Sequence, residues 1–308
     1  MKLLSNTVIN FHAVEDRDWF EKVLQLLQKN YNLISILDLE KFYFNEKIIH
    51  NACHITFDDG DLSFYYNVYP ILQKYEIPAT MFVSPQRIIK NDNFWFQEIR
   101  GYDQAILANI IRADGSVIPD DVKQTQLIAS LKNLTIEQIW QVIREYQRKT
   151  GVKPKTRQNI DVSELQKIHE EGLVIIGAHT QNHPILANEA AETSRYEISS
   201  SIKDLGDILD SPIVYFAYPN GIPGLDYGMR EMEFLKENGI NLAFSTQSKG
   251  FTKSDNILEI PRKGLSHGGS AFVVFKLILG HRWELTKRIV KGRQEENYRI
   301  KRIDRDDK

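Results

Sequence analysis

Residues 54–60 read His-Ile-Thr-Phe-Asp-Asp-Gly. The first four residues have the apolar and β-branched character of a short buried strand. Two adjacent carboxylates, Asp58 and Asp59, follow this strand, and Gly60 allows a sharp backbone turn after them. Because neighbouring side chains on a strand point to opposite faces, both carboxylates reach one site only if the strand ends there. The Asp-Asp-Gly triplet alone is weak evidence for a site, since ordinary turns favour the same residues.

Similar apolar runs occur along the chain, with helical patterns between them. Besides residues 54–57, the predicted strands are 8–11, 79–83, 174–177, 213–217 and 242–245. The clearest predicted helices are 16–28, 163–171 and 229–238. Alternating strands and helices are typical of an α/β fold with a parallel sheet or barrel, which places its chemistry at the carboxyl ends of the strands.

Residues 95–151 interrupt this alternation, because they contain helical patterns and no convincing strand. Trp140, Ile143 and Tyr146 recur at helical spacing, which indicates a face packed in a core rather than contacts to a cofactor. Long segments between the elements of a barrel are often functional. We therefore predict a helical insertion on the barrel that serves as a lid.

A second polar motif, His179-Thr180-Gln181-Asn182-His183, follows another apolar run. Two histidines four residues apart lie on one face of a helical turn, from which both imidazoles reach a single ion. A pair of aspartates and a pair of histidines, each at a strand end, together predict a metal site. Two histidines, one carboxylate and a water are the ligand set of a hydrolytic Zn²⁺ site, although Fe²⁺, Co²⁺ and Ni²⁺ accept similar ligands.

With these motifs the sequence resembles the polysaccharide deacetylase family, the NodB-homology domain of carbohydrate esterase family 4. The family's Thr-Phe-Asp-Asp-Gly motif stands at 56–60, and its His-Ser/Thr-x-x-His motif stands at 179–183. The third motif takes the Phe-Ala-Tyr-Pro form at 216–221. The opening stretch Val-Ile-Asn-Phe-His, residues 8–12, resembles the first element of the poly-N-acetylglucosamine deacetylase branch, in which the motif order is circularly permuted.

The resemblance implies a distorted (β/α)7-type barrel. The barrel would extend over residues 1–270 and carry the helical insertion at about 95–151, followed by a C-terminal helix and basic tail at 271–308. The spacing of the motifs along the chain favours this single barrel over two separate domains, although the length of 308 residues is compatible with either.

The resemblance also implies an activity, namely metal-dependent hydrolysis of the N-acetyl group of an N-acetylated sugar or polysaccharide. It implies a divalent metal, with Zn²⁺ as the first choice, held by Asp59, His179 and His183. Asp58 would be the general base that takes a proton from the attacking water. The backbone N–H of Tyr218 would donate to the oxyanion that forms in the reaction.

Two departures from the family pattern leave alternatives open. Ala217 stands where many members have an arginine that pairs with the base, so Arg262 is the candidate substitute, and the alternative is a plain surface arginine. The general acid is either His12, which ends the first predicted strand, or His267, which lies in a glycine-rich stretch. His12 is preferred because it matches the opening element of the branch. Either imidazole can protonate the leaving amine near neutral pH.

Three further questions stay open at this stage. The aromatic stretch Phe94-Trp95-Phe96 either stacks on a sugar ring or anchors the insertion in a core. The substrate is either a glycan or a lipid- or nucleotide-linked sugar, which would be deacetylated or deformylated. A degenerate homologue that only binds glycan is the alternative to an enzyme, and the absent arginine and the uncertain acid motivate it.

Charge and composition restrict the partners. The 39 Lys and Arg against 41 Asp and Glu give a net charge of -2, which excludes a globally basic nucleic-acid binder and suits a neutral sugar substrate. One cysteine, Cys53, fits a reducing compartment. No signal-peptide core and no run near the ~18 apolar residues of a membrane span is present, so we expect a cytoplasmic protein. The basic tail either docks on the barrel as a helix or makes a peripheral contact with an anionic membrane.

Overall fold

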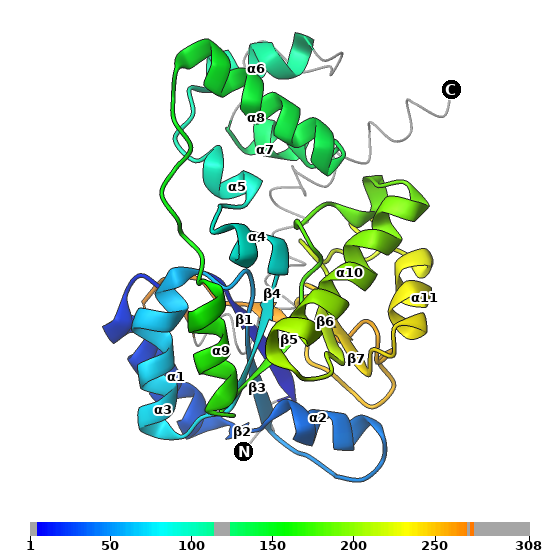
Figure 1. Cartoon of the computed structure of the whole chain (residues 1–308). Coiled ribbons are helices and arrows are strands. Elements are labelled where there is room, and N and C mark those ends of the chain that lie inside the picture. The colour runs from blue at the N-terminus through cyan, green and yellow to red at the C-terminus, as the bar shows by residue number, and fades with distance from the viewer. Residues whose placement is uncertain (1–4, 114–123, 270–271, 274–308) are drawn as a thin grey trace.

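The computed structural model describes residues 5–113, 124–269 and 272–273, in which strands and helices alternate (Figure 1). The strands are β1 (Thr7–Phe11), β2 (Asn32–Leu33), β3 (Ala52–Phe57), β4 (Ala79–Val83), β5 (Val174–Ala178), β6 (Tyr215–Ala217), β7 (Leu242–Phe244) and β8 (Lys263–Gly264). The α-helices are α1 (Arg17–Asn30), α2 (Ile36–Tyr43), α3 (Tyr69–Tyr75), α4 (Pro85–Lys90), α5 (Trp95–Glu98), α6 (Gln104–Ala113), α7 (Gln124–Leu131), α8 (Ile136–Thr150), α9 (Val162–Glu170), α10 (Ala191–Leu209) and α11 (Met229–Glu237). A short π-helix, η1 (Phe64–Val68), and a 3-10 turn, η2 (Leu186–Asn188), complete them.

All the strands are parallel and lie in the order β7-β6-β5-β4-β3-β1-β8, with β2 beside β3. The free edge of β7 pairs with the segment that leads into β8. There the N–H of Ser245 donates to the Ile260 carbonyl (2.9 Å), and the N–H of Ile260 donates to the Ala243 carbonyl (2.8 Å). The sheet therefore curls back on itself, and the predicted distorted (β/α) barrel is confirmed.

The predicted strands all appear, each within two residues of its expected ends. Two strands were missed, β2 and β8, because a two-residue strand leaves no periodicity to detect. The helix predicted to open at Ser163 begins one residue earlier. Its N-cap is Asp161, whose carboxylate accepts the N–H of Glu164.

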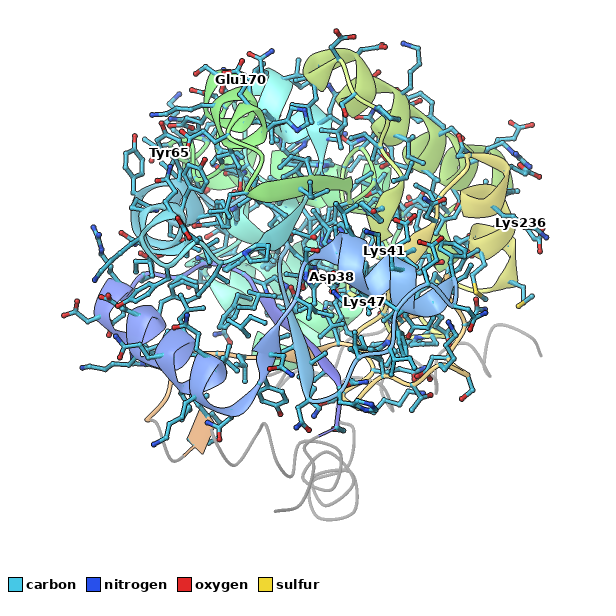
Figure 2. All side chains as sticks on the ribbon, turned by 90° about the horizontal axis from the view of Figure 1, so that it is seen from below. Asp38, Lys41, Lys47, Tyr65, Glu170 and Lys236 are labelled. Atoms are coloured by element: carbon cyan, nitrogen blue, oxygen red, sulfur yellow. The ribbon has the colours of Figure 1, made fainter. Side chains whose placement is uncertain are left out.

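Both faces of the sheet are buried, as parallel strands require. The outer face packs against α1, α3, α9, α10 and α11 in one apolar cluster. The inner face forms a second cluster, in which Val8, Phe82 and Phe244 pack with Leu39 of α2. Figure 2 views the molecule from the end opposite to the insertion and shows α2, with Asp38 labelled, at that end. Helix α2 therefore closes the amino end of the barrel.

Towards the carboxyl end the barrel interior becomes polar. His54 is fully buried there, with its Nδ1 2.9 Å from the Ile34 carbonyl and its Nε2 3.0 Å from the Thr80 hydroxyl. Burial lowers the pKa of His54 to about 4, so its ring is neutral at pH 7. Asn10 and Thr56 lie one step further along β1 and β3 and are buried as well. These polar side chains form the floor beneath the strand ends where both motifs lie.

The helices α5 to α8 make up the predicted insertion, and Figure 1 shows them beyond the end of the sheet at which α4 begins. They have an apolar cluster of their own, separate from the two clusters of the barrel. Two contacts attach them to the segment after β5: the N–H of Ile136 donates to Glu189 (2.6 Å), and the side chain of Asn188 donates to the Lys132 carbonyl (2.8 Å). The insertion is therefore fixed over the carboxyl end of the barrel.

In the ranges that the structure describes, no helix is both long and apolar enough to cross a membrane. The predicted C-terminal helix and basic tail at 271–308 lie outside the described residues, apart from Phe272 and Val273. Their contact with a membrane, like the cytoplasmic location, stays a prediction.

Candidate active site

The two aspartates of the first motif lie where β3 ends. The backbone N–H of Asp58 still donates to the Phe11 carbonyl of β1 (3.0 Å), as a strand residue does. The chain then turns, since φ is 74° at Asp59 and 68° at Gly60. A Cβ on Gly60 would lie 2.9 Å from Cγ1 of Val83, so the turn requires glycine. As the sequence predicted, both carboxylates line one cavity at this edge.

The two histidines of the second motif lie on an irregular loop after β5, so the predicted helical turn is wrong. Thr180 and His183 have φ angles of 63° and 59°, which a right-handed helix does not contain. The Thr180 hydroxyl bridges the loop, because it donates to the His179 carbonyl (2.5 Å) and accepts from the N–H of His183 (3.0 Å). The resulting bend brings the two imidazole centroids to 4.9 Å.

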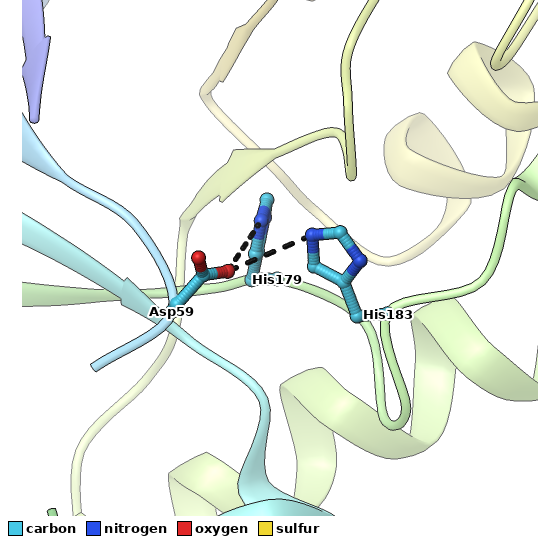
Figure 3. Close-up of side chains that lie close together, drawn as sticks. All are labelled: Asp59, His179 and His183. Carbon is cyan, nitrogen blue, oxygen red and sulfur yellow. Dashed lines mark ion pairs between the residues drawn. The ribbon is translucent and has the colours of Figure 1, made fainter. Parts of the chain in front are cut away.

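Asp59, His179 and His183 form a buried group of the size that holds one metal ion. Figure 3 shows their side chains pointing toward one another from the ends of β3 and β5. Nε2 of His179 lies 3.7 Å, and Nε2 of His183 3.6 Å, from Oδ1 of Asp59. This carboxylate oxygen is buried and has no hydrogen-bond partner among the described residues. A cation between the three ligand atoms would satisfy it.

The protonation states of the group also suit a cation. Nδ1 of His179 lies 2.7 Å from the Ala217 carbonyl, which can only accept, so Nδ1 carries the proton and Nε2 keeps its lone pair. Burial lowers the pKa of His179 to about 4 and holds that of His183 well below its usual value. Burial also raises the pKa of Asp59 to about 7. At neutral pH the group therefore offers two neutral imidazoles and a carboxyl that a cation would readily ionise.

Asp58 does not belong to this group and has hydrogen-bond partners of its own. Its Oδ1 accepts from Nη1 of Arg262 (2.7 Å), and its Oδ2 accepts from Nη2 of Arg262 (2.9 Å) and from the amide of Asn10 (2.8 Å). Burial alone would raise the pKa of Asp58. The guanidinium of Arg262 outweighs burial and holds that pKa well below its usual range. The carboxylate is therefore ionised and fixed in orientation.

Arg262 is not a surface residue, because only 1% of it is exposed. Its Nε donates to the Ser245 carbonyl (3.2 Å), and its guanidinium lies over the rings of Phe82 (5.5 Å) and Phe244 (5.9 Å). It enters the barrel from the residue before β8 and reaches Asp58 across the interior. The arginine missing at Ala217 is thus replaced in space by Arg262.

The two candidate acids lie in different places. His12 follows β1 and lines the cavity, with its Nε2 3.9 Å from Oδ2 of Asp58 and its side chain 57% exposed. His267 lies outside this cavity, where its Nε2 is 3.2 Å from Asp16 and its ring packs on Trp19 (5.3 Å between centroids). The structure therefore brings His12, and not His267, to the aspartate and histidine motifs.

The expectation for Tyr218 is wrong. Its N–H donates to the Phe244 carbonyl of β7 (3.2 Å), so it is already used in the sheet, and its hydroxyl donates to the Leu258 carbonyl (2.9 Å). The ring stacks on Tyr227 and is buried away from the cavity. The hydrogen bonding between β6 and β7 extends one residue beyond β6, so the N–H of Tyr218 is not free to meet a substrate.

Asn220, which sequence reasoning missed, takes the place of Tyr218 at the cavity. It has a φ of 55°, and its side-chain Nδ2 is buried without a hydrogen-bond partner among the described residues. Thr246 supports the turn by donating its hydroxyl to the Asn220 carbonyl (2.6 Å). The Asn-Gly pair after the strand was the available signal, because that pair is typical of a turn with positive φ.

The cavity has a volume of about 230 Å³, and the insertion supplies one of its walls. Trp95, Phe96, Ile128 and Lys132 come from the insertion. Trp95 is 1% exposed and donates its indole N–H to the His183 carbonyl (3.2 Å), whereas the half-buried ring of Phe96 faces the cavity. Trp95 thus anchors the insertion, and stacking of a sugar ring on Phe96 stays a prediction.

Several known proteins with similar sequences or folds are deacetylases. A family model described as polysaccharide deacetylase matches residues 47–243. Poly-beta-1,6-N-acetyl-D-glucosamine N-deacetylase of Staphylococcus epidermidis is 29% identical over 80 residues, so the match spans 26% of this chain and only 28% of that protein.

Two solved structures share the fold over most of the chain. Deacetylase PplD of Streptococcus pyogenes superposes with a TM-score of 0.60 and 17% identity, over 90% of this chain and 99% of that one. IcaB from Ammonifex degensii superposes with a TM-score of 0.61 and 16% identity, over 90% and 97% of the two chains. At these identities the structural matches establish the fold and not the substrate.

The three converging ligand atoms predict that the purified chain, loaded with Zn²⁺ and freed of excess, retains about one equivalent. His179→Ala removes one ligand and is expected to leave less than about a tenth of that content, by elemental analysis after gel filtration. His267→Ala is the matched control, since this histidine lies outside the group, and it is expected to retain the full equivalent. Equal Zn²⁺ content in both variants would contradict the assignment of the site.

Proposed function

The chain belongs to the polysaccharide deacetylase family, and we propose that it hydrolyses the N-acetyl group of an N-acetylated sugar or polysaccharide with the help of a divalent metal. One observation carries the proposal: the ligand atoms of Asp59, His179 and His183 converge beside a second carboxylate, Asp58, which an arginine keeps ionised. A cation-binding group next to a fixed base is what hydrolysis of an amide requires.

The side chains can be given roles in the reaction. A divalent cation held by Asp59, His179 and His183 would supply Lewis-acid activation of the water and of the amide carbonyl. Asp58 accepts a proton from the water while the oxygen of that water attacks the carbonyl carbon. His12 donates a proton to the amide nitrogen as the C–N bond breaks. The products are acetate and a free amino sugar.

Supporting contacts set the geometry for these steps. Arg262 and Asn10 bind Asp58 and direct its carboxylate, while His12 stands at the exposed side of the cavity, where a sugar nitrogen can reach it. The unpartnered Nδ2 of Asn220 offers a hydrogen bond to the acyl oxygen, a role that the engaged N–H of Tyr218 leaves open. Deacetylase PplD of Streptococcus pyogenes was solved in complex with acetate, the product expected here.

These placements support an enzyme over a homologue that only binds glycan. The two departures that motivated the binding alternative were the arginine missing at position 217 and the uncertain acid. Arg262 pairs with Asp58 from another part of the chain, and His12 lines the cavity. Comparing acetate and formate release from soluble oligosaccharides with that from lipid- and nucleotide-linked sugars would identify the substrate class.

Removal of the base is the direct test of the activity. Asp58→Asn keeps the size of the side chain but cannot accept the proton, so acetate release from N-acetylglucosamine oligosaccharides is expected to fall by about 10²–10⁴-fold. Metal content, measured on the same sample, is expected to stay unchanged. Asp103→Asn, which alters a carboxylate at the start of α6 in the insertion, serves as the control. Undiminished acetate release by metal-loaded Asp58→Asn would refute the proposal.

The general acid is tested by the leaving group. His12→Gln is expected to slow release of acetate from an amide by about 10²–10⁴-fold, because an amine leaves only after protonation. An aryl acetate ester has a leaving group that needs no proton, so its hydrolysis is expected to change much less. His267→Gln, the matched histidine outside the cavity, should leave both rates within about twofold of the parent. If His267→Gln selectively slowed amide cleavage, the assignment of the acid would be reversed.

The pair between Asp58 and Arg262 predicts a pH effect. The low pKa of Asp58 keeps the base ionised at every pH above its usual value of 3.8. Arg262→Met removes the cause that lowers this pKa, whereas burial, which raises it, stays. The acid limb of kcat/KM is therefore expected to move to higher pH by about 1 unit or more, and the loss of activity to be largest at low pH. Arg262→Lys retains a charge and should shift the limb less. Identical pH profiles of Arg262→Met and the parent would show that Arg262 does not control the base.

A further inference from the structure

The loop that carries both histidines has a conformation that its own sequence does not favour. Thr180 and His183 are both left-handed although neither is glycine, and each costs about 1 kcal/mol or more in that region. The hydroxyl of Thr180 closes the loop internally, but it does not attach the loop to the barrel. The neighbouring elements must therefore hold the loop in place.

The neighbouring elements hold the loop at several residues, since the Ser84 hydroxyl donates to the His179 carbonyl (2.8 Å) and Gln181 donates to Asp204 (2.5 Å), but Asn182, in the middle of the loop, has partners on two sides. Its backbone N–H donates to Oε2 of Glu197 (2.8 Å), and its side-chain amide donates to Oε1 of the same carboxylate (2.7 Å). Its side-chain carbonyl accepts from Nη2 of Arg87 (2.5 Å). With the Glu197 carboxylate on one side and the Arg87 guanidinium on the other, the side-chain amide of Asn182 can take only one orientation. Asn182 itself neither lines the cavity nor belongs to the metal-binding group.

Glu197 is a buried acid without a role in the proposed reaction. It lies on α10, is 2% exposed, and its backbone carbonyl also accepts the N–H of Gln181 (3.0 Å). Burial raises the pKa of its carboxyl, and the hydrogen bonds from Asn182 oppose that effect. A carboxylate buried at this depth is costly unless it is satisfied, and the described residue that satisfies both of its oxygens is Asn182.

Arg87 extends the same contacts to the insertion. It lies on α4 and is 6% exposed. Its Nη1 is 3.0 Å from Asp92, and its guanidinium lies 5.4 Å from the ring centroid of Trp140 on α8. Because Trp95 of α5 also donates to the His183 carbonyl, the loop is attached to the insertion at two points.

We propose that Glu197 and Arg87 are positioning residues that, through Asn182, hold the His179–His183 loop in the conformation that aims both imidazoles at one ion. This inference rests on the metal site proposed above. It adds two buried charges, from α10 and α4, that touch neither ligand ring but hold the loop from which both rings extend, while the Ala217 carbonyl also holds the ring of His179. Contacts behind the ligands of a metal site are typically worth 10-fold to 100-fold in affinity.

The test compares two buried glutamates. In Glu197→Gln one of the two hydrogen bonds from Asn182 is replaced by a clash of N–H groups, so Zn²⁺ affinity, measured by competition with a chelating dye, is expected to fall at least about 10-fold. Glu231→Gln is the matched control. Glu231 is also 2% exposed, and it accepts from the Ser194 hydroxyl (2.9 Å) and the Gly228 N–H (2.9 Å), away from the loop. Its Zn²⁺ affinity should stay within about twofold of the parent, while thermal stability falls in both variants.

A second variant covers the case in which Glu197→Gln does not fold. Asn182→Ala removes the side-chain bonds to Glu197 and Arg87 and leaves only the backbone N–H of position 182 on Glu197, so it is expected to weaken Zn²⁺ binding to a similar extent. With Co²⁺ as the probe, the visible absorption band of the loaded variants is expected to change, whereas that of Glu231→Gln should match the parent. In the double variant the two losses should not add, because both remove one connection.

The possible results separate the two proposals. If Glu231→Gln weakens Zn²⁺ binding as much as Glu197→Gln does, or if Glu197→Gln and Asn182→Ala bind Zn²⁺ like the parent, the positioning role is refuted while the metal site stands. If the parent itself binds no Zn²⁺, the metal site and the proposed function fail, and the positioning role fails with them.

Discussion

The ion pair between Asp58 and Arg262 is the interaction on which the rest of the site depends. It joins the end of β3 to the residue before β8, which lies 204 positions later in the chain, so it closes the barrel where the site lies. Burying two charges costs several kcal/mol each unless the pair has good geometry and further hydrogen bonds. Here two parallel bonds form the pair, and Asn10 and the Ser245 carbonyl satisfy further atoms. The bonds that offset this cost also prevent the Asp58 carboxylate from rotating.

The pair also explains how two adjacent aspartates differ. Both side chains are buried at the same edge, and burial raises the pKa of a carboxyl. Asp58 has a guanidinium beside it and stays ionised, whereas Asp59 faces neutral imidazoles and has a pKa of about 7. Titratable neighbours whose environments move their pKa values apart are typical of sites that divide two roles between them. Asp59 lacks a partner charge that a cation would supply, and Asp58 already has its own.

Sequence patterns predicted the parts of this site that depend on strand ends, and they failed where distant contacts decide the conformation. The Asp pair was placed correctly because a strand ending fixes which side chains share an edge. The histidine loop was mistaken for a helical turn, since the left-handed residues Thr180 and His183 are held by Glu197 and Trp95, which no local pattern connects to them. Tyr218 was misassigned because one more hydrogen bond to β7 extends the pairing of β6. Family resemblance, and not local sequence, suggested Arg262.

The insertion contributes more to this site than a cover over the cavity. Trp95 donates its indole N–H to the backbone carbonyl of His183, and the ring of Trp140 lies beside Arg87, which donates to Asn182. Because these contacts reach the loop near His183 from outside the barrel, a shift of the insertion would move the imidazole of His183 relative to Asp59, whereas the Ala217 carbonyl holds the ring of His179. Asp58 has no such freedom, since β3 and Arg262 fix it from inside the barrel. The site thus combines Asp58 and His179, which the barrel holds, with His183, whose position also depends on how the insertion is seated. A ligand that contacts Phe96 would therefore act on His183, whose ring centroid lies 5.0 Å from that of Phe96.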